Sequence, residues 1–148
     1  MKENLKYRFA GVSDAAILAE LNLQLIRDEG HRNPMSVDDL TVRMSIWLNG
    51  QYQAVLFKEF DQIVGYALYR HEPDFVYLRH LFVVADRRRQ GIGRHALEWL
   101  RQSAWPTAKR IRVEVLFKNE NALAFWRSVG FGEYCVTLEH QFPESGTN

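Results

Sequence analysis

The stretch Val83–Leu100, VVADRRRQGIGRHALEWL, decides the fold. An apolar strand runs into four charged residues, and a Gly-Ile-Gly turn then opens a helix. A helix N-terminus leaves about four backbone N–H groups without partners and carries partial positive charge. Gly91 and Gly93 lack the side chains that would keep an anion away from these groups. Basic side chains that can add charge-assisted contacts to phosphate oxygens surround them: Arg88, Arg89 and Arg94. The stretch therefore predicts a cradle for a diphosphate.

The composition bounds the class of protein. The chain has 148 residues, and we expect a single domain over residues 1–148 with a loose tail at about 143–148. Hydrophobic residues make up 47% and charged residues 25%, as in soluble globular proteins. The net charge of +1 creates no overall field toward nucleic acid or an acidic membrane. A single cysteine, Cys135, excludes an internal disulfide and fits a reducing compartment. No signal-peptide core or membrane-length apolar run is present, so a cytoplasmic protein is expected.

The first half of the chain predicts a strand, two helices and an antiparallel meander. The strand YRFAG precedes a helix capped by Ser13 and stopped by Gly30, and a second helix runs from Ser36 to Asn49-Gly50. The first helix has one apolar face: Ile17, Leu18, Leu21 and Leu25. Residues 51–60 and 63–70 read as a hairpin around Asp-Gln, and residues 75–84 as the next strand.

The second half predicts crossover connections. A helix runs from Gly91 to about Trp105, where Pro106 ends it. A strand over 110–117 (RIRVEVLF), a helix over 119–131 and a last strand over 134–142 (YCVTLEHQF) follow. The order β-α-α-β-β-β-α-β-α-β indicates an α/β domain whose early strands are antiparallel.

Three interpretations of the glycine junction compete. It can be a solvated basic turn whose glycines only permit the bend. It can be a dinucleotide fingerprint, because Gly91-x-Gly93-x-x-Ala96 fits G-x-G-x-x-G/A. ADRRRQ, however, separates this motif from its strand, and about 55 residues after Gly93 are too few for a full Rossmann sheet. A nucleotide P-loop is excluded because no Gly-Lys-Ser/Thr is present. The third interpretation rests on a resemblance.

Residues 78–131 resemble the acetyl-CoA-binding core of the GNAT superfamily of N-acetyltransferases. In that family a strand leads into R/Q-x-x-G-x-G/A, matched by Arg88, Gly91 and Gly93. The next strand is followed by N-x-x-A and a helix ending in Gly-Phe, matched at the positions Asn119, Ala122, Gly130 and Phe131. The resemblance implies a GNAT (acyl-CoA N-acyltransferase) fold, with a mixed sheet of about six to seven strands and about four helices.

The resemblance also implies how acetyl-CoA, the co-substrate, would be held. Backbone N–H groups from Arg89 to Arg94 would hold the pyrophosphate, and the pantetheine arm would pair with main chain at Leu81 and Val83. The N–H near Val83 would polarise the thioester carbonyl. The full set of cofactor-binding residues is Leu81, Phe82, Val83, Arg88, Arg89, Gln90, Gly91, Ile92, Gly93, Arg94, Asn119, Ala122 and Phe125.

The chain departs from the family at two positions that carry proton chemistry. Many members have a tyrosine in the last helix where this chain has Trp126, whose indole is not a useful acid. Some relatives place a glutamate base on the pantetheine strand at the position of Tyr77. Tyr77 can order a water there, or it can be a half-buried strand aromatic. An attacking amine must still lose a proton, so a base is needed elsewhere.

The segment RDEGHRNP, residues 27–34, is the densest polar cluster and lies where family members line the acceptor site. Its candidate acceptor-binding residues are Asp28, Glu29, His31, Arg32 and Asn33. Glu29 or His31 would relay the proton, which makes Glu29, His31 and Tyr77 the candidate catalytic residues. A solvated helix end with a capping turn is the competing interpretation.

Arg79 and His80 interrupt an apolar strand. Period-two geometry places Arg79 on the face of Tyr77, Leu81 and Val83, with His80 packed on the other face. Arg79 would pair with a carboxylate of the acceptor, or with Glu114 in a structural ion pair.

The sequence thus predicts a cytoplasmic N-acetyltransferase that moves an acetyl group from acetyl-CoA to a primary amine of a small molecule or peptide in a ternary complex. Protein lysine or N-terminal acetylation, and an acyl-CoA-binding regulatory domain without turnover, are the alternatives. No metal site is expected, because the histidines and the cysteine lack ligand spacing. Nucleic acid and membrane partners are not expected, and a homodimer is left open.

Overall fold

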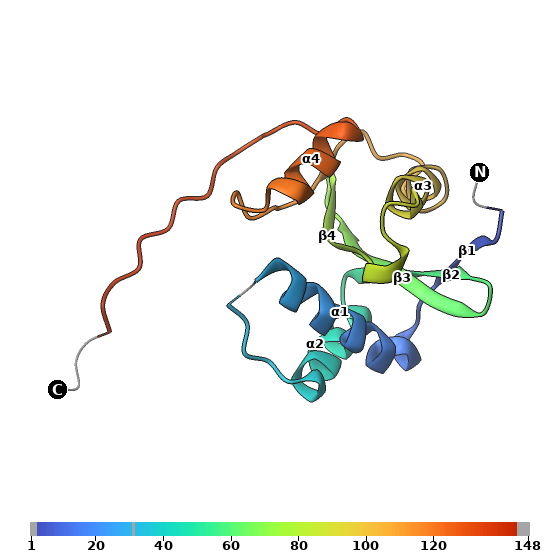
Figure 1. The fold of residues 1–148 in the computed structure, drawn as a ribbon, viewed down its shortest axis with the longest axis horizontal. Coiled ribbons are helices and arrows are strands. Elements are labelled where there is room, and N and C mark those ends of the chain that lie inside the picture. The colour runs from blue at the N-terminus through green and yellow to red at the C-terminus, as the bar shows by residue number, and fades with distance from the viewer. Residues whose placement is uncertain (1–2, 31, 145–148) are drawn as a thin grey trace. The chain divides into compact units, whose positions relative to one another are not determined.

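The computed structural model describes residues 3–30 and 32–144 (Figure 1). The chain divides into two compact units, residues 1–116 and residues 117–148, and each is described by itself below.

The first unit is built on a five-stranded sheet. Its strands are β1 (Leu5–Phe9), β2 (Tyr52–Glu59), β3 (Gln62–His71), β4 (Val76–Val83) and β5 (Ile111–Arg112). They lie in the order β1-β2-β3-β4-β5. The first four pair antiparallel and β5 pairs parallel to β4, so the predicted meander followed by a crossover is confirmed. The predicted six to seven strands are corrected to five.

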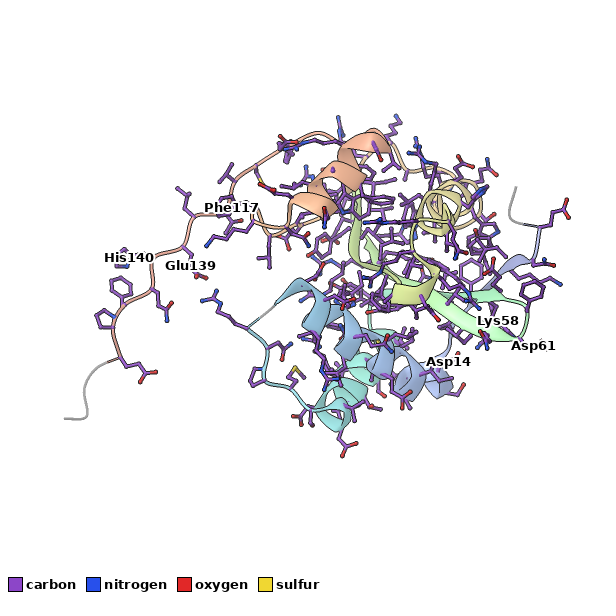
Figure 2. The ribbon with its side chains drawn as sticks, in the orientation of Figure 1. Asp14, Lys58, Asp61, Phe117, Glu139 and His140 are labelled. Atoms are coloured by element: carbon purple, nitrogen blue, oxygen red, sulfur yellow. The ribbon has the colours of Figure 1, made fainter. Side chains whose placement is uncertain are left out.

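The helix α1 (Ala15–Glu29) is preceded by a 3₁₀ turn over Val12–Asp14, so Asp14 takes the N-cap position predicted for Ser13. The Asp14 carboxylate is buried, and its oxygens accept from both terminal nitrogens of Arg8 at 3.0 Å and from the Gly11 N–H at 2.9 Å. This ties the start of α1 to β1 and fixes the helix on the sheet; Figure 2 labels Asp14. Gly30 ends α1 in the left-handed conformation (φ 65°), as predicted.

The helix α2 (Val37–Asn49) begins with the predicted capping box. The Asp39 N–H donates to the Ser36 hydroxyl at 3.1 Å, and the Ser36 N–H donates to the Asp39 carboxylate at 3.2 Å. Both helices cover one face of the sheet, and α3 (Ile92–Trp99) covers the other (Figure 1). The buried residues under α1 and α2 form one cluster: Ala15, Leu18, Leu21, Leu25, Met44, Tyr52, Ala54, Leu56, Tyr66, Leu68 and Phe82. Ile17, predicted for this face, is instead 42% exposed.

The hairpin of β2 and β3 turns one residue earlier than predicted. Glu59 pairs with Gln62, so the two-residue loop is Phe60-Asp61, with Phe60 in the left-handed region at φ 56°. Figure 2 shows Lys58 and Asp61 at this end of the hairpin.

The helix α3 continues as a π-helical turn over Leu100–Ala104, closed by a hydrogen bond from the Trp105 N–H to the Leu100 carbonyl at 2.8 Å. The Trp105 ring is buried and packs edge-on against Tyr69, with centroids 5.3 Å apart. The predicted end near Trp105, before Pro106, is therefore confirmed.

The second unit contains α4 (Glu120–Ser128). The Asn119 side chain caps it by accepting from the Ala122 N–H at 3.1 Å. The Trp126 ring packs between those of Phe125 and Phe131, with centroids 5.1 Å and 4.9 Å away. The predicted last strand over 134–142 is wrong for this structure, because these residues form neither helix nor strand. Four of its large apolar side chains are exposed: Tyr134, Val136, Leu138 and Phe142.

Gly65 allows β3 to approach β4. A Cβ at this position would lie 2.2 Å from the Phe82 carbonyl oxygen and 2.9 Å from the Phe57 ring. Since backbone cannot move aside cheaply, Gly65→Ala should destabilise the fold by about 1–3 kcal/mol in chemical denaturation. Gly11→Ala, where a Cβ meets nothing within 4 Å, should change stability by less than about 0.5 kcal/mol. Equal effects of the two changes would contradict the close approach.

Asp14 gives the fold a pH dependence. Hydrogen bonds from Arg8 hold the pKa of the Asp14 carboxyl below its usual value. A depressed folded-state pKa contributes stability above the unfolded-state pKa, and this is lost as the pH falls through the folded-state value. Arg8 is half exposed, so solvent screens the pair and Asp14→Asn should lose only about 1 kcal/mol at neutral pH. Denaturation curves of the two proteins should converge in acid. The exposed Asp38→Asn is the control; a loss from Asp14→Asn that is independent of pH would contradict the assignment.

Candidate functional site

The junction between β4 and α3 is a turn with unusual backbone conformations that leads into the first turn of the helix. Arg88 is extended, and Arg89 and Gly91 both have left-handed backbones (φ 63° and 82°). The first helical hydrogen bond joins the His95 N–H to the Gly91 carbonyl at 3.0 Å. The N–H groups of the first turn of α3 therefore have no partner inside the helix. A left-handed residue followed by right-handed ones, as at Gly91 and the helix that begins at Ile92, forms a concavity that binds anions, so the junction fits a phosphate group.

Gly91 is the position in this turn where a side chain would be tolerated least. Its φ of 82° strains any residue with a Cβ, and a Cβ would meet the His95 ring at 3.7 Å. Gly93 and Ile92 belong to the first turn of α3, where Ile92 is buried. Gln90 and Arg94 are exposed at the same turn.

Arg88 connects the junction to the end of α1. Its Nε donates to the Val83 carbonyl at 2.9 Å, and its Nη2 forms an ion pair with the Asp28 carboxylate. The structure thus brings together a residue predicted for the pyrophosphate and one predicted for the acceptor. Both side chains are 41% exposed, so the pair can exchange partners when an anion arrives.

A β-bulge in β4 falls at Arg79. Leu78 pairs with Tyr69 and His80 pairs with Leu68, so Arg79 is the extra residue. The sequence-based alternation is therefore wrong at this point. Tyr77 and Arg79 lie on the α1/α2 face of the sheet, and His80 and Phe82 lie on the same face. The predicted grouping of Arg79 with Leu81 and Val83 does not hold. Leu81 pairs with Ala67 and follows His80 directly, so its side chain lies on the opposite face of the sheet from those of His80 and Arg79.

The main chain after the bulge pairs with a neighbouring strand on one side, and on the other the Val83 carbonyl accepts from the Arg88 side chain. The Val84 N–H donates to the Val64 carbonyl at 2.9 Å, so the polar main-chain groups of Leu81 and Val83 point away from β3 by strand alternation. Among the described residues, the β4–β5 ladder covers only Val76–Ile111 and Tyr77–Arg112. The main chain of Leu81 and Val83 can therefore pair with an added extended chain. The main chain of Phe82 faces β3 and its ring is buried, so this residue contributes to the packing of the core.

Tyr77 spans the point where β4 and β5 separate. Its hydroxyl donates to the Glu114 carboxylate at 2.6 Å. Burial, and then the hydrogen bond to Glu114, raises the pKa of Tyr77 to about 12. Tyr77 therefore keeps its proton at neutral pH. Glu114, the alternative partner proposed for Arg79, instead accepts this hydrogen bond.

Tyr66 and His80 form a polar pair, and the charge of Glu29 at the end of α1 acts on Tyr66. The Tyr66 hydroxyl lies 3.0 Å from His80 Nδ1. Burial and the negative charge of Glu29 raise the pKa of Tyr66 well above its usual value, so its hydroxyl keeps its proton. His80 was expected to pack on the opposite face; a bulge leaves no trace in hydrophobic periodicity, so the sequence offered no signal for this placement.

The other residues predicted to bind the acceptor do not gather around Glu29 in the part of the chain that the structure describes. His31 lies outside the described residues, and Arg32 is exposed. The Asn33 side chain accepts from the Met35 N–H at 2.9 Å and so shapes a local turn. Asn119, Ala122 and Phe125 belong to the second unit, where the first two form the cap of α4.

Arg79 lies beside the rings of Trp47 and Tyr52 and beside a second arginine, Arg43. These three neighbours were not singled out from the sequence. The guanidinium carbon of Arg79 is 4.7 Å from the Trp47 ring centroid, and that of Arg43 is 4.3 Å from the same ring. Arg79 also donates to the Tyr52 hydroxyl at 3.3 Å.

Membrane-spanning helices and clusters of metal-ligating side chains are both absent from the described residues. None of their helices has the length and apolar character to cross a membrane. No group of three or more His, Cys, Asp or Glu side chains in residues 3–30 and 32–144 is placed to hold a metal ion.

The comparisons with known proteins agree with this geometry. The sequence model described as "Acetyltransferase (GNAT) family" matches residues 22–131. No curated protein matches the chain significantly. A possible acetyltransferase from Clostridium difficile 630 has 20% sequence identity and a TM-score of 0.75, over 95% of this chain and 98% of that one. A mutant of a Bacillus halodurans protein has 23% identity and a TM-score of 0.76, over 93% and 99%.

An aminoglycoside acetyltransferase from an uncultured soil metagenomic sample, solved with sisomicin, has 19% identity and a TM-score of 0.75, over 95% of this chain and 97% of that one. At these identities the solved structures show the shared α/β fold. The family match covers most of the chain and includes β4, the glycine junction and α4. The chain belongs to the GNAT family of acetyltransferases.

Proposed function

We propose that this protein is an acetyl-CoA-dependent N-acetyltransferase, carried by one domain over residues 1–148, that acetylates a primary amine of a small molecule or peptide by direct transfer in a ternary complex. The observation that carries the proposal is the main chain of Leu81 and Val83, which faces away from β3 beyond the end of the β4–β5 ladder, beside the N–H groups at the start of α3. An extended chain that ends in a diphosphate fits these two features together.

The junction residues would hold acetyl-CoA, which supplies an activated acetyl thioester. Backbone N–H groups from Arg89 to Arg94 would bind the pyrophosphate, and Leu81 and Val83 would pair with the pantetheine amides. The Val83 N–H would polarise the thioester carbonyl. Arg88 would leave the Val83 carbonyl and turn to phosphate, which frees that carbonyl for the pantetheine. A CoA complex of a structural relative, an aminoglycoside N-acetyltransferase with 13% identity, is consistent with this use of the fold.

Glu29 is the proposed base. It is half-buried at the end of α1, close enough for its charge to act on Tyr66. A carboxylate there can take the proton of the acceptor ammonium, directly or through water. Tyr77 would orient a water, because its pKa of about 12 keeps its hydroxyl protonated and prevents it from acting as a base.

Gly91→Val should weaken acetyl-CoA binding at least tenfold in calorimetric titration, because a branched Cβ at φ 82° strains the turn that presents the N–H groups. Gly30→Val is the matched control: Gly30 also has a left-handed backbone (φ 65°), and a Cβ there meets nothing within 4 Å. Unchanged affinity of a folded Gly91→Val protein would remove the pyrophosphate from this junction.

Glu29→Gln should lower the kcat for the best amine by about 10²-fold while leaving the Kd for acetyl-CoA within about twofold, because it removes the proton acceptor only. Turnover is measured as thiol release over a panel of small amines, amino acids and peptides. Glu20→Gln, an exposed change on the same helix, is the control. Full turnover by Glu29→Gln would exclude Glu29 as the base.

A further inference from the structure

Two arginines share one indole ring on the α1/α2 face of the sheet. Arg43 and Trp47 come from α2, and Arg79 comes from the bulge of β4. The guanidinium carbons lie 4.3 Å and 4.7 Å from the Trp47 centroid. Arg43 and Arg79 are called the arginine pair below. Cation–π contacts with a tryptophan stabilise each guanidinium and hold it in place.

The arginine pair concentrates positive charge. Burial, and then the charge of Arg79, lowers the pKa of Arg43 below its usual value. Neither arginine forms an ion pair with a carboxylate of the described residues, whereas nearby Arg70 lies 3.4 Å from Glu72. Two like charges held together without a counterion leave an attraction for an anion.

Some of the hydrogen-bond donors around the pair lack an acceptor among the described residues. Arg43 donates to the Asn22 side-chain oxygen at 3.0 Å, which fixes that amide because a guanidinium can only donate. Arg43 Nε is then buried with no hydrogen-bond partner among the described residues, and the Asn22 amide, which is 1% exposed, lies beside the Tyr66 hydroxyl. The Tyr52 hydroxyl accepts from Arg70 at 2.7 Å and from Arg79 at 3.3 Å, so its own hydrogen is left to donate. A ligand that satisfies these groups must supply acceptor oxygens.

The pair lies next to the proposed site of acetyl transfer. Arg79 is two residues before Leu81 and four before Val83 on β4, separations of roughly 7 Å and 13 Å along a strand. Its face also carries Tyr77 and the Tyr66–His80 hydrogen bond. An anionic group bound at Arg79 would thus belong to a molecule whose other end reaches the transfer site.

We infer that the arginine pair binds the carboxylate of the acceptor, so that this enzyme acetylates amines that also carry a carboxylate, such as amino acids or short peptides. The inference rests on the proposed acetyltransferase function and names its substrate class. A planar guanidinium matches a carboxylate in a bidentate arrangement. Polycationic acceptors, such as the sisomicin bound to one structural relative, would be repelled by the pair.

The test compares amines that differ only in the anionic group. Thiol release is measured for amino acids and dipeptides, each paired with its carboxamide, and β-alanine is compared with O-phosphoethanolamine to separate a carboxylate from a phosphate. The wild-type kcat/KM should favour the carboxylate by about ten- to hundredfold, the range for a hydrogen-bonded charged group. Arg79→Ala should bring this ratio close to one, and Arg79→Lys should keep part of it. The exposed Arg101→Ala is the control and should leave the ratio unchanged.

The outcomes separate this inference from the proposed function. Turnover with no preference for the carboxylate, or a preference that survives Arg79→Ala, would overturn the inference and leave the acetyltransferase intact. A preference for the phosphate would overturn the assignment to a carboxylate. If no amine is turned over, saturation-transfer NMR of the same amino acids with wild type, Arg79→Ala and Arg101→Ala decides. Loss of the signal in Arg79→Ala alone supports the anion site, and equal signals, or none, overturn it.

Discussion

The site depends on the point where β5 stops pairing with β4. The parallel ladder covers two residue pairs and ends at Tyr77. Beyond that point β4 is held by β3 on one side, and the N–H and C=O groups of Leu81 and Val83 face away from the ladder on the other. Unpaired main chain normally favours association with another strand. Here the glycine junction follows directly, so an extended ligand with a phosphate end suits the edge better than another protein strand does.

The sequence predicted most of the fold because its signals are local. The Ser36 capping box, the Gly30 stop and the break at Pro106 each depend on a few neighbouring residues, and the structure has all three. The last strand was predicted over 134–142, and these residues do not pair. Strand formation needs a partner chain, which a local pattern cannot supply. The Asp14 cap was missed for a similar reason, because its partner Arg8 lies on the preceding strand.

The sequence predicted the glycine turn and the helix that follows it, but it did not predict the contacts that Arg88 makes. The turn at Gly91 and the start of α3 could be predicted because the spacing of the glycines indicates a turn that leads into a helix. Whether an arginine faces a ligand, a carbonyl or a carboxylate depends on what lies near it in space. Arg88 contacts Val83 and Asp28, and the latter is 60 residues away in the chain. One side chain thus links the proposed cofactor and acceptor ends of the site, so binding of a phosphate at the junction would release Asp28.

The bulge at Arg79 explains why so many polar groups share one face. In a regular strand Arg79 and His80 would point to opposite sides of the sheet. The extra residue lets Tyr77 and Arg79 face α1 and α2 together with His80 and Phe82. Without it, either the arginine or the histidine would lie under α3, against an apolar core. A single inserted residue in β4 therefore assembles the proposed acceptor side of the site, four residues before Val83, whose N–H is proposed to polarise the thioester carbonyl.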